Sequence, residues 1–85
     1  MTDTDILVMR KMLKILDDIG PNGLEASDLK EQAEIAAGCP LTTAEKDLAV
    51  KEMGDRGWIA SFRQPLTGRI RWYITEHGKT ARAGL

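Results

Sequence analysis

Residues 57–74 read GWIASFRQPLTGRIRWYI, and this stretch decides the fold class. Its first part, 58–63, is rich in β-forming residues, and the segment 64–68 contains the proline and glycine that favour a turn. Its last part, 69–74, alternates, so that basic side chains share one face and apolar side chains share the other. The apolar face comprises Ile70, Trp72 and Ile74. The stretch therefore predicts a β-hairpin with a five-residue loop.

Two helical segments are predicted upstream of the hairpin. Residues 4–19 place apolar side chains over roughly half of a helical circumference, which is wide for a helix covering one small core. The segment 20–23, Gly-Pro-Asn-Gly, ends this helix. Residues 24–26 are expected to be a short extended link, and Ser27 is the expected N-cap of a second helix that runs to about Ala37.

A third helix is predicted from Thr42 to Arg56. Thr42 and Glu45 have the spacing of a capping box, in which each side chain bonds to the free backbone N–H of the other residue. A glycine follows the helix and ends it. After the hairpin, we expect a cap and a short helical turn over 75–79, and a frayed end over 80–85.

Composition limits the kind of protein. The chain has 85 residues, which predicts one domain over 1–85. Hydrophobic residues make up 42% and charged residues 29%, values typical of a globular protein and not of a disordered chain. The formal net charge is -1, so the totals do not indicate a strongly basic nucleic-acid binder. If the protein binds nucleic acid, its basic charge must be local.

The scarcity of reactive side chains argues against an enzyme. Cys39 and His77 are the single cysteine and histidine, too few for a structural zinc site, and no catalytic or phosphate-binding motif stands out. We therefore expect no metal and no cofactor. One cysteine allows no intrachain disulfide, which favours a cytoplasmic location. The longest apolar run is 6–9, far short of a membrane-spanning helix, and the acidic start does not resemble a secretory signal.

The order helix, helix, helix, hairpin, short tail resembles the winged helix-turn-helix family over roughly residues 6–80. Three segments carry the resemblance: LEASDL at 24–29, AVKEMGDRGWI at 49–59 and YITEHGK at 73–79. The resemblance implies an α+β fold with a three-helix core, a short strand and a C-terminal hairpin wing. It also implies a small protein that binds double-stranded DNA, as a transcriptional regulator or a phage or mobile-element accessory factor. The third helix would lie in the major groove and the wing on the phosphate backbone.

Basic residues gather around the predicted hairpin loop. Arg63, Arg69 and Arg71 are candidate phosphate contacts, and Gln64 and Thr67 add neutral donors. An alternative interpretation is that these arginines discourage strand-to-strand aggregation at the edge of a small sheet. On the third helix, the residues expected near the bases are Thr43, Lys46, Asp47 and Lys51. Carboxylates on this helix oppose an approach to phosphates, although one can accept a hydrogen bond from cytosine N4.

Leu48 on the third helix is expected to point away from the core. It could contact a thymine methyl group, anchor a protein partner, or pack under Leu41 or the tail. Acidic residues on the same helix also support an alternative function, a winged-helix protein–protein interaction module that does not bind DNA. The wide apolar stripe of the first helix suggests a homodimer, with contacts expected at Leu7, Val8 and Ile15.

Overall fold

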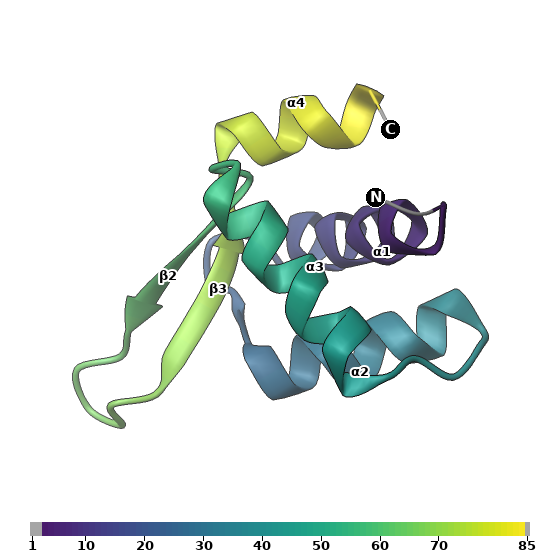
Figure 1. Cartoon of the computed structure of the whole chain (residues 1–85). Coiled ribbons are helices and arrows are strands. Elements are labelled where there is room, and N and C mark those ends of the chain that lie inside the picture. Colours follow the sequence, from purple (N-terminus) through teal and green to yellow (C-terminus); the bar gives the residue numbers. More distant parts are fainter. Residues whose placement is uncertain (1–2, 85) are drawn as a thin grey trace.

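The computed structural model describes residues 3–84, which form four helices and three strands (Figure 1). The helices α1, α2 and α3 come first, the hairpin β2–β3 projects away from them, and α4 lies over α1 (Figure 1). The predicted α+β architecture is therefore confirmed. The elements in chain order are α1 (Asp3–Ile19), β1 (Leu24–Glu25), α2 (Ala26–Ala37), α3 (Thr43–Asp55), β2 (Ile59–Arg63), β3 (Ile70–Ile74) and α4 (Glu76–Gly84).

The break between α1 and α2 depends on glycine. Gly23 has a φ of 69°, and a Cβ atom on it would lie 2.3 Å from the carbonyl oxygen of Trp72. The close approach lets β1 pair with β3, with Leu24 opposite Trp72. The predicted extended link is confirmed for Leu24 and Glu25, but Ala26 already belongs to α2, and the predicted cap at Ser27 is wrong. Helix α2 begins at Ala26, after the extended residue Glu25, because the paired strand runs directly into the helix.

The N-terminus of α3 is built as its sequence predicts. The backbone N–H of Glu45 donates to Thr42 Oγ1 at 3.1 Å, and the backbone N–H of Thr42 donates to Glu45 Oε1 at 3.1 Å. A cap of this kind stabilises a helix by about 1 kcal/mol. At the other end the chain turns at Gly57, whose φ is 74°, a conformation that suits glycine. The capping box thus sets where α3 begins.

Within residues 3–84 the strands form one antiparallel sheet in the order β1-β3-β2. The register of β2 and β3 places Ser61 opposite Trp72 and Arg63 opposite Ile70. Directly opposed residues in an antiparallel pair lie on the same face of the sheet. Arg63 therefore shares its face with Trp72, whose ring lies next to Gly54 of α3. The opposite face carries Arg71.

The C-terminal segment is more ordered than expected. Residues 80–84 were predicted to fray, yet they continue α4, and that prediction is wrong; the remaining residue of the predicted frayed end lies outside the described residues. Arg82 forms an ion pair with Asp17 of α1, which ties the end of α4 to the first helix. Tertiary contacts of this kind stabilise short helices whose local propensity is weak.

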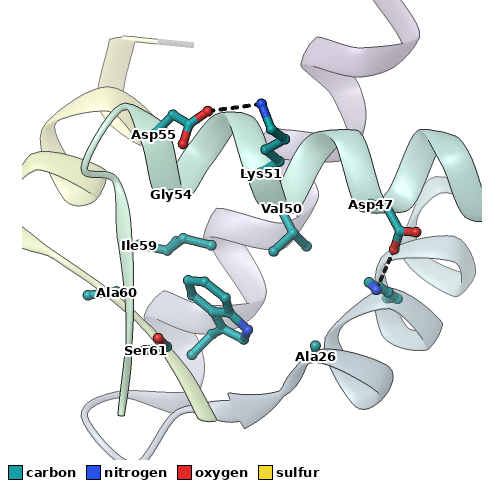
Figure 2. Close-up of a pocket in the computed structure, with 11 residues that line it drawn as sticks. Ala26, Asp47, Val50, Lys51, Gly54, Asp55, Ile59, Ala60 and Ser61 are labelled. Carbon is teal, nitrogen blue, oxygen red and sulfur yellow. Dashed lines mark hydrogen bonds and ion pairs between the residues drawn. The ribbon is translucent and has the colours of Figure 1, made fainter. Parts of the chain in front are cut away.

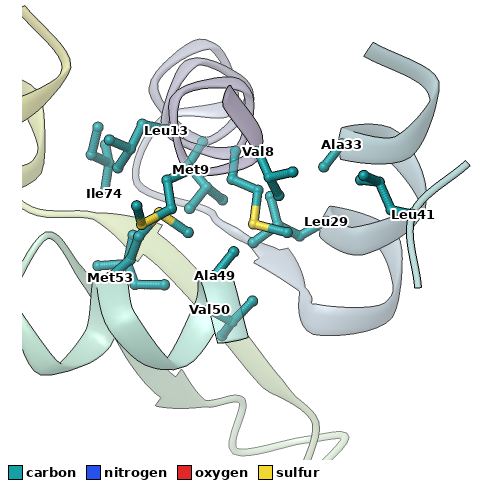
Figure 3. Packing of buried hydrophobic residues seen from close by; sticks show 13 residues of the cluster. Val8, Met9, Leu13, Leu29, Ala33, Leu41, Ala49, Val50, Met53 and Ile74 are labelled. Carbon is teal, nitrogen blue, oxygen red and sulfur yellow. The ribbon is translucent and has the colours of Figure 1, made fainter. Parts of the chain in front are cut away.

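The core lies between the three N-terminal helices and the base of the hairpin (Figure 3). Val8 belongs to this core and is 1% exposed, so the prediction that it contacts a partner subunit is wrong. Leu7 is half-buried, and Ile15 is half-buried and packs against the core. The buried cluster comprises Val8, Met9, Met12, Leu13, Leu16, Leu29, Ala33, Leu41, Ala49, Val50, Met53, Ile59 and Ile74.

Candidate nucleic-acid interface

Helix α3 turns one side to the core and the other to solvent. Ala49, Val50 and Met53 are buried, so the residues on the opposite side of the helical wheel point outward. Thr43, Asp47 and Lys51, three of the residues predicted to lie near the bases, follow one another at four-residue spacing and are exposed. Leu48 is also exposed, at 43%. The structure therefore presents a continuous strip of α3 that a partner molecule can reach.

A groove of about 690 Å³ separates α3 from the hairpin (Figure 2). Its floor is apolar, with Val50 and Ile59 directed into it and the Trp72 ring on the hairpin side. Its rim is charged and belongs to the helices. The rim comprises Lys30, Asp47, Lys51 and Asp55. The groove therefore has a charged edge along the helices and a mainly apolar edge along the hairpin.

The charges on the rim are arranged in pairs. Lys30 Nζ lies 2.5 Å from Asp47 Oδ1, and Lys51 Nζ lies 3.4 Å from Asp55 Oδ2 (Figure 2). The side chains of Lys51 and Asp47 are 72% and 54% exposed. Exposed pairs of this kind contribute about 0–1 kcal/mol, so a phosphate can compete for either lysine. Sequence reasoning missed Lys30, because nothing in the local pattern shows that α2 borders this groove.

Lys46 lies apart from this strip. Its Nζ is 3.1 Å from Glu34 Oε2, and its side chain is only 19% exposed. Glu34 also accepts a hydrogen bond from the backbone N–H of Leu41. Together the Lys46 hydrogen bond, the Leu41 hydrogen bond and the lysine charge lower the pKa of Glu34. Lys46 therefore fastens α3 to α2, which argues against the predicted role of Lys46 near the bases.

The three arginines of the wing do not act as one cluster. Arg63 is exposed, lies on the groove face and has no hydrogen-bond or ion-pair partner among the described residues. Arg69 is 68% exposed and lies 3.1 Å from Glu25 Oε1 on the other side of the sheet. Arg71 is half-buried on that same side, donates to the carbonyl oxygen of Gly23 at 3.1 Å, and its buried Nε has no partner. Arg71 thus holds the wing to the α1–α2 break, which argues against a phosphate contact there.

The wing loop is closed by its own polar groups. The backbone N–H of Gln64 donates to the Arg69 carbonyl at 2.9 Å, and the Thr67 hydroxyl donates to Gln64 Oε1 at 3.1 Å. Thr67 Oγ1 also accepts from the Arg69 backbone N–H. Gln64 and Thr67, the two neutral donors predicted to contact DNA, therefore use their polar groups within the loop. Sequence reasoning missed the residue between them, Leu66, which is 99% exposed.

Other site types find no support in the part of the chain that the structure covers. Over residues 3–84, no group of three or more histidine, cysteine, aspartate or glutamate side chains is placed to hold a metal ion. None of the helices described there is both long enough and apolar enough to span a bilayer. The groove and the wing are therefore the features on which a function can be argued.

Comparisons with known proteins agree with the architecture. Neither models of protein families nor the sequences of curated proteins match the chain. Among solved structures, the PcaV transcriptional regulator from Streptomyces coelicolor, crystallised with its natural ligand, superposes with a TM-score of 0.69 over 98% of this chain. The two sequences are 20% identical, and this chain spans 51% of the PcaV chain. With its exposed third helix and its projecting hairpin, this chain has the winged helix-turn-helix fold.

Proposed function

We propose that this chain binds double-stranded DNA and acts in transcription regulation. In this proposal α3 lies in the major groove and the wing contacts the phosphate backbone. One observation carries the proposal: Asp47 and Lys51 of α3 line the groove beside the hairpin, and the unpaired Arg63 of the wing lies on the same face of the sheet as the groove residues Ser61 and Trp72. The similarity to PcaV, a transcriptional regulator, supports the same function.

The cations of this surface suit phosphate binding. Arg63 carries an uncompensated charge, and a guanidinium binds phosphate oxygens with two parallel hydrogen bonds. Arg69 is paired with Glu25, but the guanidinium is largely exposed, so a phosphate can share it at small energetic cost. Thr43 lies at the N-terminus of α3, where free backbone N–H groups also attract anions. On α3, Lys51 is the cation that would contact the DNA phosphate backbone beside the major groove.

A fluorescence anisotropy titration with a labelled random duplex at low salt tests this function. The double variant Arg63→Glu, Arg69→Glu should bind about tenfold more weakly or worse, because each lost phosphate contact reduces counterion release. The matched control is Arg10→Glu, Lys14→Glu, which changes the net charge equally on the exposed side of α1. The control should bind as the wild type does. Equal losses in both variants, or a wild type that does not bind the duplex, would contradict DNA binding.

A second candidate function is protein recognition by α3. Its support is the exposed Leu48, together with the acids Asp47 and Asp55 beside it, which disfavour an approach to phosphates. The same titration separates the two functions. A wild type that ignores random duplex DNA would favour the protein-interaction module, and Leu48→Asp would then be the variant that removes partner capture without unfolding the chain.

We further propose that the protein pairs with a second copy of itself through α1. Leu7 and Ile15 are half-buried on this helix, and Leu7 is not part of the packing around the core cluster. Leu7→Asp is the informative variant, because Ile15 also supports the core. Sedimentation velocity should show a dimer for the wild type and a monomer for Leu7→Asp. A monomeric wild type at high concentration would contradict the pairing.

A further inference from the structure

The tip of the wing presents one apolar side chain on a closed loop. Leu66 is 99% exposed, and the loop around it projects beyond the helices (Figure 1). Single exposed leucines are common on protein surfaces and need no explanation. Here, however, the loop is held by hydrogen bonds across its base, from Gln64 N–H to the Arg69 carbonyl and from Gly68 N–H to the Gln64 carbonyl. The backbone that carries this side chain is therefore already ordered, so binding need not order the loop.

Positive charge flanks this tip on both sides. Arg63 ends β2 on the groove face, and Arg69 precedes β3 on the opposite face. A projecting leucine between two guanidinium groups has the form of a minor-groove wedge, in which an apolar side chain contacts partly unstacked bases while cations meet the phosphates along both walls. The two arginines would fix the loop on the two backbones while the leucine points between them.

We propose that Leu66 is an apolar wedge that enters the minor groove of the bound duplex and partly unstacks one base step. This inference rests on the proposed DNA binding and specifies how the wing contributes to it. Unstacking opposes binding, and burial of the leucine together with closer approach of the arginines offsets it. Pyrimidine–purine steps unstack most easily, so the wedge favours such steps without any hydrogen bond to a base.

The other apolar side chains of the wing favour DNA over a lipid surface. Phe62 and Ile70 are partly exposed, at 37% and 48%, but the strand register puts them on opposite faces of the hairpin. Insertion into a bilayer needs apolar side chains gathered on one face. A single leucine at the tip, with the next apolar residues turned apart, fits a narrow groove and not a membrane interface.

Two measurements on one duplex test the wedge. In an anisotropy titration, Leu66→Ala should lower the affinity about tenfold, because a buried leucine contact is lost. The dependence of affinity on salt should keep its slope, because no phosphate contact changes. Leu66→Met should bind nearly as the wild type does. Ile35→Ala is the matched control, since Ile35 is 73% exposed on α2, away from the wing, and it should change nothing.

Energy transfer between dyes at the two ends of a duplex of about 20 base pairs reports bending. The wild type should bring the ends closer than Leu66→Ala does at saturation. Thermal unfolding should be unchanged in Leu66→Ala, because the side chain has almost no contact with the protein. Equal affinity and equal transfer in the two proteins would overturn the wedge, and DNA binding would still stand if Arg63→Glu, Arg69→Glu weakens it. Leu66-dependent binding to anionic vesicles but not to duplex would overturn both proposals.

Discussion

Arg69 Nη1 lies 3.1 Å from Glu25 Oε1, so the wing loop is tied to strand β1 by an ion pair between residues 44 positions apart. The Glu25 side chain is 22% exposed and the Arg69 side chain 68%. The pair therefore lies at the surface, and Glu25 is more shielded from solvent than Arg69. Arg69 is consequently the wing cation whose charge is shared, whereas Arg63 has no such partner among the described residues. The strength of the proposed phosphate contact at the tip depends on how easily Glu25 releases Arg69.

Glu25→Gln should therefore strengthen duplex binding. The variant leaves Arg69 fully available to phosphate, and we expect about a two- to threefold gain in affinity at low salt, with a steeper salt dependence. Asp18→Asn makes the same change of net charge on the exposed side of α1 and should have a smaller effect. Anisotropy titrations at several salt concentrations check both. A gain that is equal in the two variants would mean that total charge, and not Arg69, is responsible.

Substitutions of the two partners in the Lys30–Asp47 ion pair should change duplex affinity in opposite directions. Asp47→Asn removes a carboxylate from the exposed strip of α3 and frees Lys30, so we expect duplex affinity to rise a few-fold. Lys30→Gln leaves Asp47 uncompensated, so affinity should fall. Each change should cost about 1 kcal/mol of stability or less, because the Asp47 side chain is 54% exposed and solvent screens the pair. Changes in affinity of the same sign in both variants would contradict this account of the groove.

The bond between Lys46 and Glu34 predicts a pH-dependent contribution to stability. The pKa of Glu34 lies below its ordinary value of 4.5, and the hydrogen bond from Lys46 is the main cause. A lowered folded-state pKa stabilises the protein above the unfolded-state value, and the gain is lost as pH falls through the folded-state pKa. Urea unfolding at neutral and at acidic pH should show wild type more stable than Glu34→Gln near pH 7, with the difference shrinking as the pH falls below the ordinary value of 4.5. Lys46→Gln should reproduce most of this pattern, and a difference that grows on acidification would refute it.

Two helical glycines should respond oppositely to alanine. A Cβ atom on Gly78 would lie 2.1 Å from the Trp58 carbonyl oxygen and 2.7 Å from Ile74 Cγ1, so Gly78→Ala must push α4 away from the hairpin. We expect a loss of about 2 kcal/mol or more. A Cβ atom on Gly54 would meet only the Trp72 ring, at 3.8 Å, an ordinary contact. Gly54→Ala should stabilise α3 by about 0.5–1 kcal/mol. Denaturant midpoints check both, and similar shifts in the two variants would contradict the prediction.

Local sequence rules predicted the elements that depend on neighbouring residues. The capping box of Thr42, the glycine that ends α3 and the hairpin around its proline–glycine loop all appear as expected, because each depends on contacts within a few positions. The alternation over 69–74 also placed Arg69 and Arg71 on one face correctly. The expected cap at Ser27 was wrong, because the strand pairing of Glu25 places the N-cap of α2 two residues earlier.

By itself, the sequence determined the order of the first three helices and the hairpin, and the location of the basic wing. Only the tertiary structure decided which cations remain available. Arg71 bonds to the carbonyl of Gly23, 48 positions away, and Arg82 pairs with Asp17 across 65 positions. Such partners are set by the packing of whole elements and by strand register, which no local pattern contains. For the same reason, the separation of Arg63 from the other wing arginines became visible only once β2 was placed beside β3.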